Sequence, residues 1–173
     1  MRSQNTEVRI IKMKMLKNYA VILILFLSQT GFAQKIPDCK LANEYIEQLI
    51  SKKAEELQGV EYCQYRHYNS LDDLDNDGVD DFILVFSVEG ALGNAGNSIE
   101  FMMVFLSTIK VSSPLETQIG NRGKVTFDDF VNVSNNIIEL ELLVWRENDA
   151  LCCPSGKGKA IYQIKDKQII KIE

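Results

Sequence analysis

Acidic side chains recur at alternate positions in one short segment of the chain, and this spacing is typical of a calcium-binding loop. Calcium takes about six to eight oxygen ligands, and a tight loop supplies them from its positions 1, 3, 5 and 9 and from the carbonyl at position 7. Counted from the first aspartate, these positions are Asp73, Asp75, Asp77, Asp81 and the carbonyl of Val79. Gly78, at position 6, allows the sharp turn that such a loop needs. The segment predicts a bound calcium ion; the alternative is a solvated acidic turn, because Asp, Asn and Gly also favour turns without a metal.

Two features distinguish this segment from an EF-hand loop. Position 12, where an EF-hand has a bidentate glutamate, is Leu84. Residues 82–88, which follow the loop, are β-branched and aromatic and predict a buried strand instead of a helix. An aspartate-rich turn that leads into a strand resembles the calcium loops of FG-GAP and integrin-type repeats. This resemblance implies that the four aspartates are metal ligands, although the chain lacks the repeated units of those propellers.

Candidate catalytic residues are few. The single histidine, His67, lies in an aromatic segment that predicts a strand, and no Gly-x-Ser-x-Gly motif accompanies it. Glu139 and Glu141 share one face of a predicted strand, where they could mimic a glycosidase pair, but we favour an ordinary solvated face. Residues 154–159 do not match the phosphate-binding motif Gly-x-x-x-x-Gly-Lys-[Ser/Thr]. We therefore expect no enzymatic activity.

The chain has four cysteines: Cys39, Cys63, Cys152 and Cys153. In an oxidising compartment, an even number of cysteines predicts disulfides, here two. A bridge between neighbouring residues strains the peptide, so we expect Cys152 and Cys153 each to pair with Cys39 or Cys63, in an order that the sequence leaves open. Adjacent cysteines with one distant histidine match neither a zinc site nor a Cys-x-x-Cys redox motif.

The first 33 residues have the pattern of a secretory signal peptide. Lys17 precedes the apolar residues 19–27, and Gly31 and Ala33 are small residues where signal peptidase cleaves. The apolar stretch is too short for a membrane anchor, and no lipobox precedes Cys39. Met13 and Met15 are alternative positions for the first residue of the translated protein. We expect residues 34–173 to be exported as one domain, to the periplasm or the medium.

The predicted mature chain is acidic. The whole sequence has a net charge of −5, and removal of five basic residues and one acidic residue with the signal peptide leaves −9. This charge argues against nucleic-acid binding. The remaining 140 residues suit a single domain with a substantial core.

The pattern of apolar residues predicts one helix followed by strands. The helix covers residues 38–57, with Asp38 as its N-cap and Gly59 just beyond its end. Strands are predicted at residues 60–68, 82–88, 99–106, 125–133, 137–146, 160–164 and 169–172, with a hairpin turn at residues 134–136. We therefore expect an α+β domain, with the N-terminal helix packed on a mostly antiparallel sheet of about six or seven strands.

The motif Cys152-Cys153-Pro154, together with the aspartate-rich segment before a strand, resembles small exported bacterial proteins of unknown function, the LppP/LprE type among them. The resemblance implies export and a compact disulfide-bonded domain, and it transfers no activity. We expect a disulfide-stabilised, calcium-binding envelope or secreted domain without catalytic activity. One alternative is a module that binds an envelope protein or a glycan through residues 90–97 and 148–159. Another is a calcium-dependent hydrolase, in which the ion acts as a Lewis acid.

Overall fold

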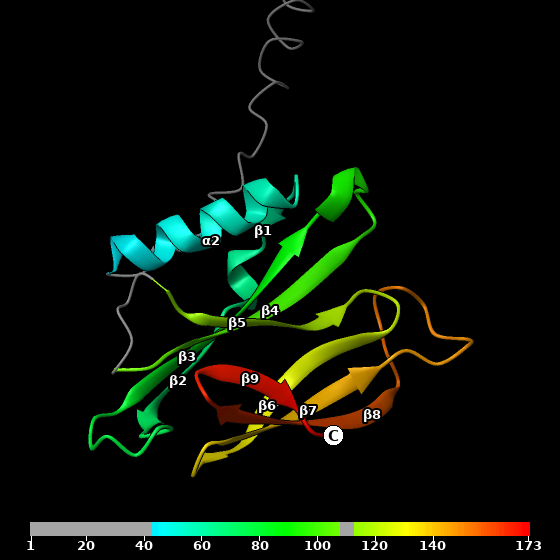
Figure 1. Ribbon diagram of the computed structural model, residues 1–173. Helices are drawn as coiled ribbons and strands as arrows, with labels where there is room; N and C mark the ends of the chain where they lie inside the picture. The colour runs from blue at the N-terminus through cyan, green and yellow to red at the C-terminus, as the bar shows by residue number, and fades with distance from the viewer. Residues whose placement is uncertain (1–42, 108–112) are drawn as a thin grey trace, which may run out of the picture. The chain divides into compact units, whose positions relative to one another are not determined.

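The computed structural model describes residues 43–107 and 113–173, all within a compact unit that comprises Cys39–Glu173. The described strands form one sheet in which every pairing is antiparallel (Figure 1). They are β1 (Val60–Glu61), β2 (His67–Asp72), β3 (Asp81–Glu89), β4 (Ser98–Phe105), β5 (Leu115–Asn121), β6 (Val125–Ser134), β7 (Ile137–Val144), β8 (Gly156–Lys165) and β9 (Gln168–Lys171). The order in the sheet is β1-β3-β4-β5-β6-β7-β8-β9, and β2 also pairs with β3. The helices in this part of the chain are α2 (Glu44–Glu56) and two 3₁₀ turns, η1 (Cys63–Tyr65) and η2 (Ala91–Gly93).

The prediction of an α+β domain with six or seven strands is wrong. The described residues form nine strands and one α-helix of 13 residues, so the fold is predominantly β. The segment predicted as one strand at residues 60–68 is divided by η1 into two short strands, β1 and β2. The other additional strand, β5, was missed because its sequence, LETQIGN, is mostly polar. Its place in the sheet instead comes from pairing along β4, an earlier strand of the chain, while only one residue pair, between neighbours in the sequence, joins it to β6.

Helix α2 begins where its N-cap satisfies the first free backbone amides. The Asn43 Oδ1 atom accepts hydrogen bonds from the amides of Tyr45, at 3.0 Å, and Ile46, at 3.4 Å. The predicted helix at residues 38–57 is therefore wrong at its start, because Asn43 has an extended backbone and α2 begins at Glu44. Asp38, which the sequence suggested as the N-cap, lies outside the described residues, as does the predicted signal peptide, residues 1–33. In the described part of the chain, no helix is both long enough and apolar enough to cross a membrane.

The end of α2 shows why a glycine follows it. Gln58, and not Gly59, adopts the left-handed conformation, with φ of 54°. Gly59 is needed for another reason: a Cβ atom there would lie 2.6 Å from the carbonyl oxygen of Glu89 on β3. The predicted helix stop is therefore correct in place, but the glycine permits a close approach to the sheet.

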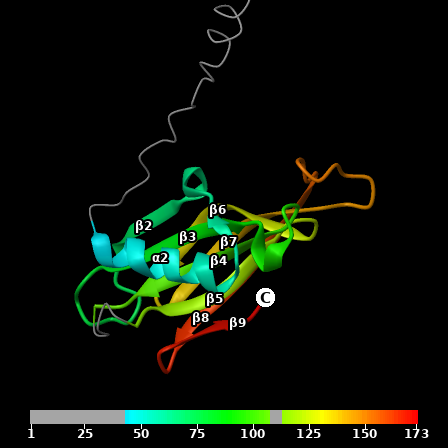
Figure 2. The same cartoon turned by 90° about the horizontal axis from the view of Figure 1, so that it is seen from above.

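The two central strands, β3 and β4, are buried on both faces. On one face, α2 packs against Leu84, Phe86, Phe101 and Met103 of these strands. The other face packs against buried residues of β5 to β8. Figure 1 shows α2 on one side of β3–β5 and β6–β9 on the other, and Figure 2 shows the helix lying across β3 and β4. Only one residue pair, Asn121 with Val125, joins β5 to β6, where the sheet turns back on itself.

Two hairpins shape the second half of the sheet. Asn135 and Asn136 have positive φ values of 50° and 66° and connect β6 to β7, which confirms the predicted hairpin turn. Asp166 and Lys167 make the same kind of two-residue turn between β8 and β9, with φ values of 50° and 57°. In both turns the loop conformation matches the right-handed twist of the paired strands.

Candidate functional site

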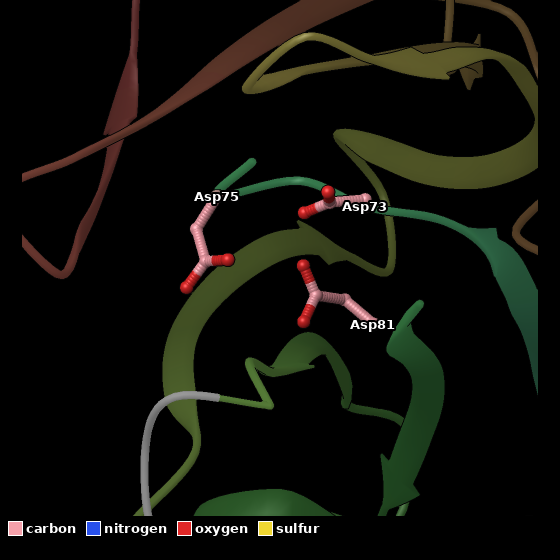
Figure 3. A group of neighbouring side chains, drawn as sticks. All are labelled: Asp73, Asp75 and Asp81. Carbon is pink, nitrogen blue, oxygen red and sulfur yellow. The ribbon is translucent and has the colours of Figure 1, made fainter. Parts of the chain in front are cut away.

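The acidic loop lies between β2 and β3 and brings three of the predicted ligands together. One carboxylate oxygen from each of Asp73, Asp75 and Asp81 lies within 4.8 Å of the other two. Figure 3 shows the three carboxylates arranged around a common space, with Asp73 and Asp75 from the loop and Asp81 from the start of β3. The loop therefore places an oxygen-rich group at the entry to a central strand.

Hydrogen bonds to backbone amides shape this loop. The carboxylate of Asp73 accepts from the amide of Asp77 at 3.0 Å and from that of Gly78 at 2.8 Å. Asn76 and Gly78 have φ values of 59° and 89°, and such positive values favour Asn and Gly. Each oxygen of Asp73 accepts one bond in these contacts, and a carboxylate has about four acceptor positions. The turn thus retains acceptor capacity that a cation can use.

Asp81 is the most enclosed of the three aspartates, with 4 % of its surface exposed. Its two oxygens accept from the amide of Leu74 at 2.7 Å and from the amide of Ser107 at 2.8 Å. Burial raises the pKa of Asp81 and the charges of Asp75 and Asp77 add to this rise, although the two amide bonds oppose it. The local environment therefore disfavours one more negative charge, which a bound cation would compensate.

Asp77 and Val79 hold other positions in the loop. Asp77 is not one of the three grouped carboxylates: its oxygens accept from the Val79 amide, at 2.7 Å, and from the Ser107 hydroxyl. Ligation by Asp77 and by the Val79 carbonyl stays a prediction. Ser107, just beyond β4, was missed by the sequence analysis. It contacts both Asp77 and Asp81, but no local motif marks a serine that lies 26 residues after Asp81.

The cysteines pair differently from the prediction. Cys152 and Cys153 form a disulfide with each other, with their Cα atoms 3.8 Å apart, so the expectation that each would pair with Cys39 or Cys63 is wrong. Both lie in the exposed loop between β7 and β8, orange in Figure 1, where a tight turn brings the Cys153 amide to within 2.9 Å of the Ala150 carbonyl. Cys63 is also disulfide-bonded, and Cys39 falls outside the described residues.

His67 lies half-buried on β2 between two aromatic rings. Its ring centroid is 5.1 Å from that of Tyr65 and 4.9 Å from that of Phe127, both in edge-on arrangements. Burial lowers the pKa of His67, and the charges of Asp129 and Asp128 only partly oppose this effect. The imidazole is therefore neutral at pH near 7 and packs as an aromatic side chain.

The two glutamates considered as a glycosidase pair form ion pairs across the sheet. Glu139 accepts from Lys159 at 2.6 Å and Glu141 accepts from Lys157 at 2.9 Å, both between β7 and β8. These lysines are more than half exposed. Such a ladder of opposite charges is ordinary for the solvated face of a sheet and supports the interpretation given to these residues. The segment at residues 154–159 enters β8 and so leads into a strand.

Comparisons of the chain with protein-family models, with curated proteins and with solved structures give no match. The resemblances to FG-GAP loops and to LppP/LprE-type proteins thus rest on short sequence motifs. Function has to be inferred from the geometry of the chain's own residues.

Proposed function

We propose that the chain is an exported domain whose loop between β2 and β3 binds calcium. The supporting observation is the grouping of Asp73, Asp75 and Asp81 within 4.8 Å at the ligand spacing seen in the sequence. All three donors are carboxylates, which suit a hard cation such as calcium better than zinc or copper. Asp77 and the Val79 carbonyl complete the proposed ligand set.

The location of the loop gives the ion a structural role. Leu74, within the loop, is fully buried in the core, and Asp81 is the first residue of β3. An ion held by the carboxylates of Asp73, Asp75 and Asp81 would fix the path of the chain into this central strand and reduce the repulsion among the carboxylates. Metal binding and folding are therefore coupled, because the ligands come together only in the folded chain.

The affinity is expected to be weak, because the loop lacks a bidentate glutamate at position 12. Extracellular calcium modules bind with dissociation constants of about 10⁻⁴ to 10⁻³ M. With calcium at about ten to a hundred times the dissociation constant, binding to the folded state alone adds about 1.4 to 2.7 kcal/mol to the free energy of unfolding. Such a gain is large enough to raise the midpoint of thermal unfolding measurably.

The test compares two single variants in the same loop. Asp75→Asn removes a carboxylate from the group of three, and Asp80→Asn removes one from an exposed neighbour outside that group. Thermal unfolding, with disulfides intact, is measured in excess calcium and in a calcium chelator. We expect calcium to raise the midpoint of the wild-type chain and of Asp80→Asn, and to raise that of Asp75→Asn much less.

Two results would contradict the proposal. One is an unchanged midpoint for the wild-type chain in calcium, which would leave the loop as an acidic turn. The other is an equal calcium response in all three proteins, which would place the ion elsewhere. Isothermal titration with calcium on the same proteins measures the affinity directly and does not depend on unfolding.

A further inference from the structure

A second candidate site lies away from the acidic loop. A pocket of 590 Å³ is bordered by η1, by the ends of β3 and β4 and by the loop between β7 and β8. This volume is within the range of about 300 to 1,000 Å³ that is typical for small-molecule sites. The two segments that the sequence analysis considered for binding both reach it, through Gly96 on one side and Cys152 on the other. The described fold thus brings these segments to one cavity.

The floor of this pocket includes a buried carboxylate, that of Glu100. Only 3 % of the surface of Glu100 is exposed, and the residue lies near the start of central strand β4. Its carboxylate accepts from the Phe127 amide, at 2.8 Å, and from the Thr126 hydroxyl. Among the described residues, no lysine or arginine forms an ion pair with Glu100. A buried carboxylate is costly for a fold unless it is compensated, so its place beside a pocket indicates a use.

The backbone is adapted to this carboxylate. The pairing of β4 with β5 shifts register at Glu100, where Gly120 lies opposite, so β5 has a bulge. A Cβ atom at position 120 would overlap the Glu100 carboxylate and lie 2.8 Å from the Val125 carbonyl oxygen. Only glycine leaves room for the acid at this point. Bulges of this kind are frequent beside functional sites, where they reorient a side chain.

The charges that line the pocket are predominantly negative. Besides Glu100, it is lined by Glu89 and Asp128, and its one arginine, Arg122, is 2.9 Å from the Glu89 carboxylate. His67, which also lines the pocket, is neutral at pH near 7, because burial lowers its pKa. Of these carboxylates, Glu89 is paired with Arg122 and Asp128 interacts with the charge of Lys157, whereas Glu100 forms no ion pair with a lysine or arginine of the described residues.

Aromatic rings form much of the pocket wall. They belong to Tyr62, Tyr65, Phe127 and Trp145. The Tyr65 hydroxyl is hydrogen-bonded to Thr126 at 2.8 Å and donates to the Phe127 carbonyl at 2.5 Å, so this ring is held in place. Electron-rich ring faces attract cations, and they do so most strongly where water is excluded.

The wall that contains Tyr62, Tyr65 and His67 is anchored to the helix. Arg66, with 3 % of its side chain exposed, donates to Glu47 on α2 at 2.7 Å and to Glu61 on β1 at 2.6 Å. These charge-assisted bonds fix the segment between β1 and β2. The pocket therefore has a rigid wall, and little binding energy would be lost in ordering it.

We propose that this pocket binds a small organic cation, a primary or quaternary ammonium compound, through the Glu100 carboxylate and the surrounding aromatic rings. A buried acid supplies the charge that such a ligand needs, and the rings supply favourable contact with its alkylated nitrogen. The site is separate from the calcium loop, and neither proposal depends on the other.

The test uses choline as the probe and its neutral carbon analogue, in which a tert-butyl group replaces the trimethylammonium group. Trp145, the one tryptophan of the sequence, lines the pocket, so its fluorescence reports on binding. Titrations are done at a fixed calcium concentration, with calorimetry as a second measurement. We expect a saturable change with choline and none with the neutral analogue over the same concentrations.

Variants locate the binding in the pocket. Glu100→Gln should weaken choline binding about tenfold or more, because a charge-assisted contact is lost. Asp128→Asn, which removes a second pocket carboxylate, should weaken it several-fold and serves if Glu100→Gln does not fold. Glu139→Gln removes a charge from β7, where the acid is paired with Lys159, and should leave binding unchanged.

Three outcomes would overturn the proposal. They are no saturable response to choline in the wild-type chain, equal binding of the neutral analogue, and equal loss of affinity in Glu139→Gln and the pocket variants. The first would leave the pocket without a cation ligand. The second would assign recognition to shape and apolar contact alone, and the third would reduce the effect to the overall charge of the protein.

Discussion

At the scale of single residues, the most consequential side chain is one that no motif marks. Glu100 lies in a strand with the sequence SIEFMMVF, all of whose residues are buried. Burial raises the pKa of Glu100, although hydrogen bonds from the Thr126 hydroxyl and the Phe127 amide oppose this rise. An acid whose pKa is higher in the folded chain than in the unfolded chain stabilises the fold when it is protonated.

This shift predicts a pH dependence of stability. The contribution of Glu100 to the free energy of unfolding is fully present below the ordinary glutamate value of 4.5 and declines as the pH rises through the higher pKa of the folded state. Glu100→Gln has no such titration. We expect the free energy of unfolding of the wild-type chain, relative to that of Glu100→Gln, to fall as the pH is raised from below 4.5 toward neutrality.

Urea unfolding of both proteins over a series of pH values gives this difference. Asp81 also has a raised pKa, but it is present in both proteins, so its effect cancels in the comparison. A difference that stays constant with pH, or that grows as the pH rises, would show that the carboxylate is compensated in the folded state.

At the scale of elements, local signals were predictive and distant contacts were not. The turn at Asn135 and Asn136 was predictable because asparagine readily adopts the positive φ values that a two-residue hairpin turn requires, and both residues have them in the structure. Strand β5 was not predictable, because a polar sequence becomes a strand there by pairing with β4. The aspartate spacing identified Asp73, Asp75 and Asp81, whereas Ser107 is joined to them only by the fold.

The loop between β7 and β8 shows the same limit. Its sequence contains two adjacent cysteines, and because a disulfide between adjacent residues strains the peptide, Cys39 and Cys63 were predicted as their partners. The folded loop is instead closed on itself: Asp149 accepts from the amides of Arg146, at 2.7 Å, and Ser155, at 2.8 Å. The cysteines lie at the exposed end of this closed loop and bridge each other.

This arrangement predicts that the Cys152–Cys153 bridge contributes little to stability. A disulfide stabilises mainly by closing a long loop of the unfolded chain, and a bridge between neighbours closes none. We expect the double variant Cys152→Ser/Cys153→Ser to lose less than about 1 kcal/mol of unfolding free energy, measured in urea. Cys63→Ser is the comparison and should cost about 2 to 5 kcal/mol, because that residue also forms a disulfide. A similar loss in both proteins would show that the loop is needed by the rest of the fold.

At the scale of the whole described unit, two apolar clusters share the same central strands. Phe86 belongs to the cluster beneath α2, and Leu140 belongs to the cluster between β3–β4 and β6–β8. Both side chains are fully buried. Because β3 and β4 contribute residues to both clusters, loss of packing on one face is transmitted to the other. The single residue pair between β5 and β6 makes this shared core the main connection between the two halves of the sheet.

Shared packing predicts that the halves unfold together. Phe86→Ala should cost about 3 to 5 kcal/mol and Leu140→Ala about 2 to 5 kcal/mol of unfolding free energy. Far-ultraviolet circular dichroism reports on α2 and the sheet together, whereas Trp145 fluorescence reports on the end of β7. We expect the two probes to give the same midpoint in each variant, as for a two-state transition. If Phe86→Ala shifted the dichroism midpoint and left that of Trp145 unchanged, the helix-side half would be an independent unit, and the sheet would be held together by β5 and β6 alone.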